Sequence, residues 1–402
     1  MYQVKRRGNL YRTDLTYTPE TVGDSSVENL KFLSAEIDVA VNERGSFVFK
    51  IAPTHAYYGT FKKLEHALQV RINNEDFARP VHYFRVIGIS RDFWDNEIIT
   101  CEGLIGMLGD CLALPYFADT QYDRLIEGGF DEQESVSTIT LAKIVSWLLY
   151  DSLRDQHAGS FRYSHAVTEP SDTSGLARSC DGTQSVLAEM LDIIDSFGGY
   201  LCVSNVIFTD SAFTPTYYYK SAAPPGKTCT QTIEYGKNLL DLTVHEDVDD
   251  MYTSCLAVGD VTGTPTVKQW GSEGSETARD QNDGALYVDY SEQYIKQYGR
   301  RVIFKHFDGL TNPSDIYNAA RGYLRQLIRQ NTTIEIKAID LKAVDSTQDG
   351  FTAGDNVHIV SDPHGIDDTY LCAQAHIDLC DMSKSYYVFG ASFKRISSMI
   401  KK

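Results

Sequence analysis

Residues 341–379 read LKAVDSTQDGFTAGDNVHIVSDPHGIDDTYLCAQAHIDL. Apolar and polar residues alternate at 356–361 and again at 370–379, which predicts two strands. Glycine, proline and aspartate separate these strands and are typical of turns. The preceding residues 332–340, TTIEIKAID, alternate in the same way. The pattern therefore predicts an antiparallel meander of three strands, which is common in small β-barrels.

The bulk composition describes a globular, acidic, multidomain protein. A chain of 402 residues is too long for one small core, so we expect two to four domains. The 25 tyrosines favour β-structure and protein contacts, although packing within sheets accounts for them equally well. A net charge of −18 disfavours a surface that grips nucleic acid by neutralising phosphates, or one that binds anionic membranes.

The sequence shows neither a recognisable targeting signal nor a closely spaced pair of cysteines. No apolar run is long enough to span a bilayer, and no apolar core follows the basic residues 5–7, so we expect folding in a cytoplasm. The eight cysteines are scattered without a C-x-x-C pair. Because several lie within apolar patterns, we predict reduced core thiols, without a disulfide frame or zinc site.

Residues 1–112 predict a first β-barrel domain. Turn residues separate its five alternating segments, which lie at 36–41, 46–51, 67–72, 82–90 and 97–102. Residues 57–64 predict a short helical excursion between two of these strands.

Residues 113–236 predict an α/β insert domain. Its predicted elements are helices at 138–153 and 183–197, strands at 200–208 and 216–220, and a polar loop at 159–182. Thr183 is the expected N-cap of the second helix, and Gly198 is expected to end it.

Residues 237–402 predict a second β-barrel domain with an inserted helical segment at about 285–331. The elements expected there are strands within 237–261 and 386–396, a polar loop at 263–284, and a helix beginning at Pro313. That helix places its apolar residues three or four apart, as Ile316, Ala319, Ala320, Tyr323, Leu324, Leu327 and Ile328. The predicted class is therefore α+β, β-rich and multidomain.

Four local clusters contain residue types that carry chemistry. In DPHGIDD at 362–368, His364 lies among carboxylates that can bind a metal or shuttle a proton, but this composition is more typical of a tight turn. HEDVDD at 245–250 offers oxygen ligands for calcium without the EF-hand spacing.

The other two clusters are also weak. Thr54 and His55 suggest a nucleophile and its base, yet adjacent residues rarely meet in that geometry. Gly103, Gly106 and Gly109 look like a dinucleotide motif, but no βαβ pattern surrounds them. We therefore predict no catalytic, cofactor-binding or metal-ligating residues, and no cofactor.

Several motifs occur in a characteristic order. They are GSFVF at 45–49, PTH at 53–55, CEG at 101–103, NLLDL at 238–242, Glu246-Asp247, Tyr252, AIDL at 338–341 and the segment 351–367. In this order they resemble the hub module of phage tail-tip and baseplate proteins, which is the N-terminal module of siphophage tail-associated lysins and minor structural tail proteins.

The resemblance implies two β-barrels per chain and a trimeric ring at the distal end of a bacteriophage tail. The ring would join the tail tube to the tip and let DNA pass, and an acidic lumen would repel the DNA backbone. The implied partners are the distal tail protein ring, the tape measure protein, and tail fibre or receptor-binding proteins. The implied location is the virion, at the tail tip or baseplate, after assembly in the host cytoplasm.

Two other functions stay open. A peptidoglycan-degrading enzyme would need two carboxylates ~5–10 Å apart, such as Asp367 and Asp247. A glycan- or receptor-binding module would use tyrosines such as those at 217–219, although a strand in the insert explains them better. Many proteins that share these motifs carry a hydrolase or fibre domain after the hub. This sequence ends shortly after its last predicted strand, so we expect no enzyme.

Overall fold

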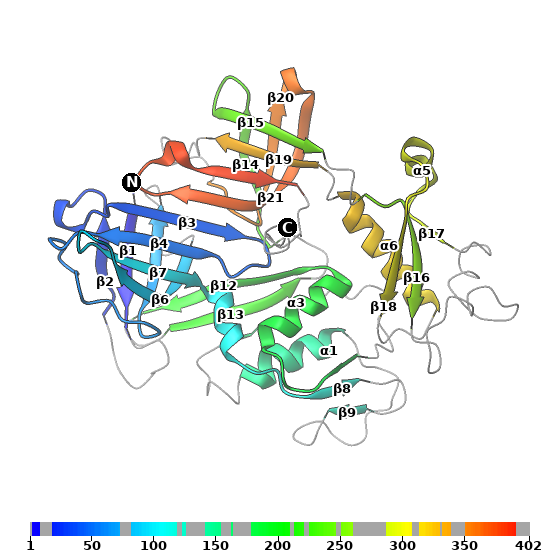
Figure 1. Ribbon diagram of the computed structural model, residues 1–402, viewed down its shortest axis with the longest axis horizontal. Coiled ribbons are helices and arrows are strands. Elements are labelled where there is room, and N and C mark those ends of the chain that lie inside the picture. Colours follow the sequence, from blue (N-terminus) through cyan, green and yellow to red (C-terminus); the bar gives the residue numbers. More distant parts are fainter. Residues whose placement is uncertain are drawn as a thin grey trace, which may run out of the picture.

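The computed structural model describes residues 2–8, 18–72, 82–118, 123–125, 141–153, 162–163, 178–209, 213–220, 225–246, 251–259, 287–307, 313–329, 332–338 and 350–390. Within these ranges, a large curved β-sheet forms one side of the molecule, and helices with small sheets form the other (Figure 1).

The first seven strands form a continuous part of the large sheet. They are β1 (Tyr2–Arg7), β2 (Glu20–Asp24), β3 (Ser34–Ala40), β4 (Ser46–Ile51), β5 (Ala67–Ile72), β6 (His82–Arg91) and β7 (Glu97–Gly103). They pair antiparallel in the order β3-β4-β7-β6-β5-β1-β2. Short 3-10 helices, η1 (Glu28–Leu30) and η2 (Leu104–Asp110), precede β3 and follow β7. The five strands predicted in this region are confirmed to within two residues.

The predicted helix at 57–64 is wrong. This segment forms turns and coil, and Gly59 has a φ of 72°, outside the helical region. Tyr57 and Phe61 pack around Arg6, whose guanidinium carbon lies 4.9 and 5.2 Å from the two ring centroids. This tertiary packing overrides the weak helical pattern.

The second half of the chain supplies the remaining strands of the large sheet. They are β14 (Thr228–Glu234), β15 (Leu239–Glu246), β19 (Thr332–Ala338), β20 (Asn356–Ser361), β21 (Ile366–Asp378) and β22 (Tyr386–Phe389). Two 3-10 helices, η6 (Asp362–His364) and η7 (Met382–Lys384), precede and follow β21. The predicted last strand ends at Phe389, and residues 391–396 lie outside the described ranges.

The predicted meander is only partly correct. β20 and β21 form an antiparallel hairpin, and Gly365 turns the chain between them with a φ of 65°. However, β19 pairs with β15 and β22, while the other neighbour of β20 is the parallel strand β14. An alternating pattern identifies strands, but it does not specify their partners.

Strand β21 also joins the two halves of the chain. Its residues 374–378 pair antiparallel with residues 36–40 of β3, and we call this pairing the seam. Ile37 and Ile377 are buried in one core on the two sides of the seam. The strands described therefore form a 13-stranded sheet that curls into a half-barrel, which confirms the β-rich class.

The insert forms a separate group of elements beside the large sheet. They are β8 (Tyr116–Ala118), β9 (Asp123–Leu125), α1 (Leu141–Ser146) with a π-helical turn at Trp147–Asp151, β10 (Arg162–Tyr163), β11 (Arg178–Cys180), α3 (Val186–Phe197), β12 (Tyr200–Phe208) and β13 (Phe213–Lys220). Gly198 ends α3 as predicted, but Ser185, and not Thr183, is its N-cap. The hydroxyl of Thr183 donates instead to Asp181. Most of the predicted loops at 159–182 and 263–284 lie outside the described ranges.

The helical segment of the second half packs with this insert. It contains β16 (Ser254–Gly259), β17 (Val288–Asp289), α5 (Glu292–Tyr298), β18 (Val302–Phe307) and α6 (Pro313–Arg329). Ile316, Ala320 and Leu324 of α6 lie in the same buried cluster as Met190 of α3, so the predicted amphipathic helix is confirmed. The chain thus has one core under the large sheet and a second under α1, α3 and α6, while the division at 112 and 236 stays a prediction.

Every cysteine is a free thiol, as predicted, and six of the eight are buried. Among the described residues, no helix is long and apolar enough to cross a membrane.

Two buried histidines make the first half sensitive to acid. Burial lowers the pKa of His82 to about 3 and that of His66 to about 4. Between these values and the ordinary pKa of ~6.5, the unfolded chain binds protons that the folded chain does not, so folding stability falls as the pH drops from 6.5 toward 4.

We expect His82→Leu to weaken this acid sensitivity. Removing one such group should make the slope of stability against pH between 6 and 4 shallower by up to ~1.4 kcal/mol per pH unit, which is one proton. Urea denaturation at several pH values measures the slope. The same slope in both proteins would show that His82 does not contribute.

The seam should be a main source of stability. The side chain of Ile37 has no exposed surface, so Ile37→Ala should leave a cavity in the core. We expect the free energy of unfolding to fall by roughly 2–5 kcal/mol. Val48→Ala on the neighbouring strand removes a 36% exposed side chain and should cost less than ~1 kcal/mol. Urea denaturation compares the two variants, and equal losses would contradict the role of the seam.

Candidate functional site

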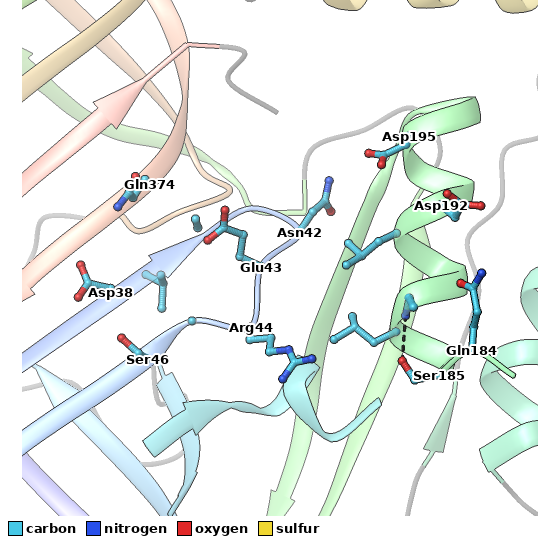
Figure 2. A pocket seen from close by; sticks show the side chains of 16 residues that line it. Asp38, Asn42, Glu43, Arg44, Ser46, Gln184, Ser185, Asp192, Asp195 and Gln374 are labelled. Atoms are coloured by element: carbon cyan, nitrogen blue, oxygen red, sulfur yellow. Dashed lines mark hydrogen bonds between the residues drawn. The ribbon is translucent and has the colours of Figure 1, made fainter. Parts of the chain in front are cut away.

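The turn between β3 and β4 separates two cavities where the large sheet meets the insert. The first, of about 740 Å³, lies between this turn and α3, and we call it the turn–helix groove (Figure 2). Its lining comprises Asp38, Val39, Ala40, Asn42, Glu43, Arg44, Gly45, Ser46, Gln184, Ser185, Leu187, Ala188, Leu191, Asp192, Asp195 and Gln374. The second, of about 700 Å³, is lined partly by β12 and the adjoining ends of β6 and β7.

The turn–helix groove has a charged rim and an apolar wall. Glu43 lies on its sheet side, and Asp192 and Asp195 lie on α3 across from it (Figure 2). Leu191 and Ala188 provide the apolar surface on the same helix. Arg44 adds a basic side chain on the sheet side, so the charges that line the groove are mixed.

Asn42 fixes the turn to the insert. Its backbone has a φ of 62°, a left-handed conformation that asparagine tolerates. Its side-chain nitrogen donates to the carbonyl of Gly199 at 3.1 Å, and its side-chain oxygen accepts from the Leu201 N–H at 2.8 Å. One side chain therefore satisfies two backbone groups at the start of β12 and sets one side of the groove.

Arg85 ties β6 to the segment that leads into the insert. Its side chain is 3% exposed and lies 2.5 Å from a carboxylate oxygen of Glu102. It also donates to Asp110 and to the carbonyl of Gly106 in η2. A buried cation that satisfies two carboxylates is structural, because breaking it would strand a charge in the interior.

The glycines at 103, 106 and 109 belong to this same structure. A Cβ on Gly103 would lie 2.1 Å from the carbonyl oxygen of Arg44, and one on Gly106 would lie 2.4 Å from the Glu102 carboxylate. Glycine is needed for these close approaches, and the three positions lie in β7 and η2 without a βαβ unit. They are therefore packing residues.

The DPHGIDD cluster is the tip of the β20–β21 hairpin. His364 accepts or donates one bond at 2.7 Å, to the hydroxyl of Ser361. Asp367 lies 2.8 Å from His358 on the adjacent strand, and its side chain is 74% exposed. The turn interpretation is thus the better one. Its suggested carboxylate partner, Asp247, lies outside the described residues, as does most of the 245–250 cluster.

Thr54 and His55 do not form a catalytic pair. Thr54 is exposed, whereas His55 is buried and its Nδ1 accepts from the Tyr57 N–H at 3.2 Å. Burial lowers the pKa of His55. The two side chains therefore occupy different environments.

The tyrosines at 217–219 are part of β13. Tyr217 and Tyr219 have no exposed surface and donate to the carbonyls of Leu104 and Gly198. They fix the insert to η2 and to the end of α3, so they are not available to stack on a sugar. In the part of the chain that is described, no group of three or more His, Cys, Asp or Glu side chains could hold a metal ion.

Sequence reasoning missed the turn–helix groove. Its lining comes from residues 38–46, 184–195 and 374, and nothing in a local pattern brings these together. Asn42 offered the one available signal, because it lies among the turn residues between the strands predicted at 36–41 and 46–51. Its bonds to Gly199 and Leu201, however, depend on the tertiary fold.

Comparison with known proteins gives a family match and several similar folds. Residues 227–399 match the family described as prophage endopeptidase tail. The prophage tail protein gp18 from Listeria monocytogenes EGD-e is 14% identical with a TM-score of 0.57, over 99% of this chain and 97% of that one. No curated protein matches significantly.

Two other tail proteins have the same fold. The 43 kDa tail protein of prophage MuSo2 from Shewanella oneidensis is 10% identical with a TM-score of 0.58, over 96% of this chain and 97% of that one. The tail protein from Neisseria meningitidis MC58 is 14% identical with a TM-score of 0.57, over 97% and 95%. At these low identities, the similarity to the three solved structures shows the fold alone. The family match is independent of it, because it rests on the sequence of residues 227–399.

We expect Asn42→Gly to loosen the joint between turn and insert. Glycine keeps the left-handed backbone but leaves the Gly199 carbonyl and the Leu201 N–H without their partner, so stability should fall by ~1–3 kcal/mol. Hydrogen–deuterium exchange should be faster at Leu201. Asn42→Asp keeps the acceptor for Leu201 and should protect this amide better. Unchanged exchange at Leu201 in Asn42→Gly would contradict the assignment.

Proposed function

We propose that this chain is a structural hub at the distal end of a bacteriophage tail. The sequence match and the fold are both consistent with a phage tail family. In this proposal, three copies form a ring that joins the tail tube to the tip and lets DNA pass. The coarser conclusion, a structural protein of the phage tail, has the support of the comparisons.

The observation that carries the proposal is the seam. Because β3 and β21 pair, strands from both ends of the chain form one curved surface over one core. Each half of the chain contributes one group of strands to this surface, so a ring of three chains would present six such groups. This number suits the junction of a six-fold tube with a three-fold tip. Cyclic symmetry is an ordinary way to close an assembly.

The charge of the chain supports DNA passage. A net charge of −18 gives a surface that repels phosphate, so a ring lined by part of this charge would not retain the DNA backbone. The partners in this proposal are the distal tail protein ring, the tape measure protein, and tail fibre or receptor-binding proteins. The site of action is the virion, at the tail tip or baseplate, after assembly in the host cytoplasm.

We also propose that the chain is not an enzyme, although the matched family is described with the word endopeptidase. The supporting observations are that His364 and the glycines from 103 to 109 have structural contacts, and that Thr54 is exposed whereas His55 is buried. Release of labelled peptidoglycan fragments by the purified chain would contradict this part of the proposal. Glycan binding has less support, because Tyr217 and Tyr219 are buried and only Tyr218 of the three tyrosines is half-buried.

We expect the purified full-length chain to form a trimer of about 135 kDa, three times its mass of 45.1 kDa. Sedimentation velocity with negative-stain images of the same sample tests this, and the images should show three-fold rings with a central channel. A monomer at every concentration would contradict ring formation by the chain alone. A lumen lined mainly by lysine and arginine would contradict repulsion of DNA.

A further inference from the structure

A loop without regular secondary structure packs against the core of the large sheet. It comprises residues 52–66, which join β4 to β5 and cross the two strands that lie between them in the sheet, and we call it the strap. Phe61 of the strap is 5% exposed, and its ring meets the ring of the fully buried Phe49 edge to face, with centroids 5.4 Å apart. The strap therefore closes the core with an aromatic side chain of its own.

A buried cation holds the middle of the strap. Arg6 donates to the carbonyl of Thr60 at 3.3 Å and to its hydroxyl at 2.7 Å. The same guanidinium lies over the rings of Tyr57 and Phe61, and it is 2.8 Å from the Glu20 carboxylate. The strap thus closes over a positive charge that has little contact with water.

Two imidazole rings fix the strap near its ends. Nδ1 of His55 accepts from the Tyr57 N–H at 3.2 Å, and Nδ1 of His66 accepts from the Lys62 N–H at 3.2 Å. A ring nitrogen that accepts a hydrogen bond carries no proton, so both bonds need a neutral imidazole. Protonation would place an N–H where a backbone N–H already points. Each bond is therefore lost when its ring takes up a proton.

The surroundings of His66 oppose its protonation while the strap is closed. Burial lowers the pKa of His66 to about 4, and the charges of Arg6 on β1 and Lys62 on the strap act in the same direction. Glu65 on the strap and Glu20 on β2 act in the opposite direction. The closed strap consequently holds this ring neutral against a neighbouring buried cation.

The surroundings of His55 are mostly apolar. Burial lowers the pKa of His55, and the Leu30 carbonyl partly offsets this effect. Its ring lies 5.9 Å from that of Phe32 and 6.3 Å from that of Tyr57, measured between centroids. A proton on His55 would therefore bring a charge into an aromatic environment.

The remaining contacts of the strap involve the turn between β6 and β7. The Gly59 N–H donates to the Glu97 carboxylate at 3.0 Å, and the Tyr58 hydroxyl donates to the Asp95 carbonyl at 2.8 Å. The Arg91 guanidinium lies over the Tyr58 ring. Glu97 is thus one further titratable group that holds the strap.

The strap also has a strained residue at its second end. Leu64 has a φ of 55°, in the left-handed region that a bulky side chain rarely adopts. Its N–H donates to the carbonyl of Val86 at 2.8 Å, which keeps it in place. Strain of this kind persists only where the surrounding contacts enforce it, so it favours opening once the imidazole bonds are lost.

We propose that the strap is an acid-sensitive lid, which stays closed while His55 and His66 are neutral and opens locally when their rings take up protons. Protonation removes two hydrogen bonds and places a positive charge beside Arg6. The open strap would withdraw Phe61 from the core, so the chain would present this apolar surface in acid and hide it at neutral pH. The lid is independent of the ring proposed above, because the contacts that hold it lie within one chain.

Hydrogen–deuterium exchange of the full-length chain tests the proposal without any substitution. Protection is measured as the exchange rate relative to that of an unstructured chain at the same pH. Because the pKa of His66 is about 4 in the closed strap and ~6.5 when exposed, this ring alone should raise the open fraction about 20-fold between pH 7 and pH 5. Protection of the Thr60 and Leu64 amides should fall by this factor or more.

Amides in the middle of the sheet distinguish a local opening from global unfolding. At pH 5, the Thr60 and Leu64 amides should be much less protected than those of Phe49 on β4 and Ile99 on β7. Equal protection of all four amides at pH 5 would show that the strap opens only when the sheet unfolds, and it would overturn the proposal. The same result follows if protection of the strap does not change with pH.

Variants that keep the acceptors identify the groups responsible. His55→Asn combined with His66→Asn places a neutral oxygen near each Nδ1 position, so strap protection should be nearly the same at pH 7 and pH 5. His82→Leu is the matched control, because it removes a buried histidine outside the strap, and there the fall of about 20-fold should persist. An undiminished fall in the double variant would overturn the role of the two rings.

Glu97→Gln separates the histidines from the carboxylate. Glutamine keeps an oxygen acceptor for the Gly59 N–H and does not titrate, so the strap of this variant should still open in acid. Loss of the pH dependence in Glu97→Gln would assign the device to the carboxylate and contradict the proposal. Melting temperatures show whether each variant is folded, and the comparison within the wild-type chain decides the proposal even where a substitution unfolds the protein.

Discussion

The pairing of β3 with β21 is the constraint on which the structure depends. It joins residues 36–40 to residues 374–378, so it closes a loop of more than 300 residues. Closing so long a loop costs entropy that no local contact offsets. The compensation comes from burial, because Ile37 and Ile377 lie with strands from both halves in one core. The strands of the first and second halves of the chain are therefore expected to fold together, as one unit.

Strand β3 also positions the turn that lines the turn–helix groove. β3 ends at Ala40 and passes directly into the turn of Asn42, whose side chain holds the start of β12. β4 then carries the chain toward Lys50, whose ammonium group donates to Asp92 in the turn between β6 and β7. The turn–helix groove and the β6–β7 turn thus lie at opposite ends of β4 and β7. Their spacing depends on the number of residues in β4 and β7, and it is insensitive to the loops outside the core.

Local pattern predicted the elements well and their contacts poorly. The five early strands, the hairpin at Gly365 and the stripe on α6 follow from alternation, turn residues and helical spacing. The partner of β19 could not be predicted, because period-2 patterns are alike for every neighbour. The turns at 57–64 depend on Arg6, more than fifty residues away. The groove combines three distant segments, and no sequence motif marks it.

Electrostatics explains why an assembly of this chain would need apolar contacts between its copies. Copies that each carry a net charge of −18 repel one another, and this repulsion weakens only as salt screens it over ~8–10 Å. Burial of aromatic surface does not depend on charge, so Phe93 and Trp94 can supply attraction where the surface as a whole cannot. A strongly acidic chain can in this way repel DNA over most of its surface and still bind its own kind at a defined point.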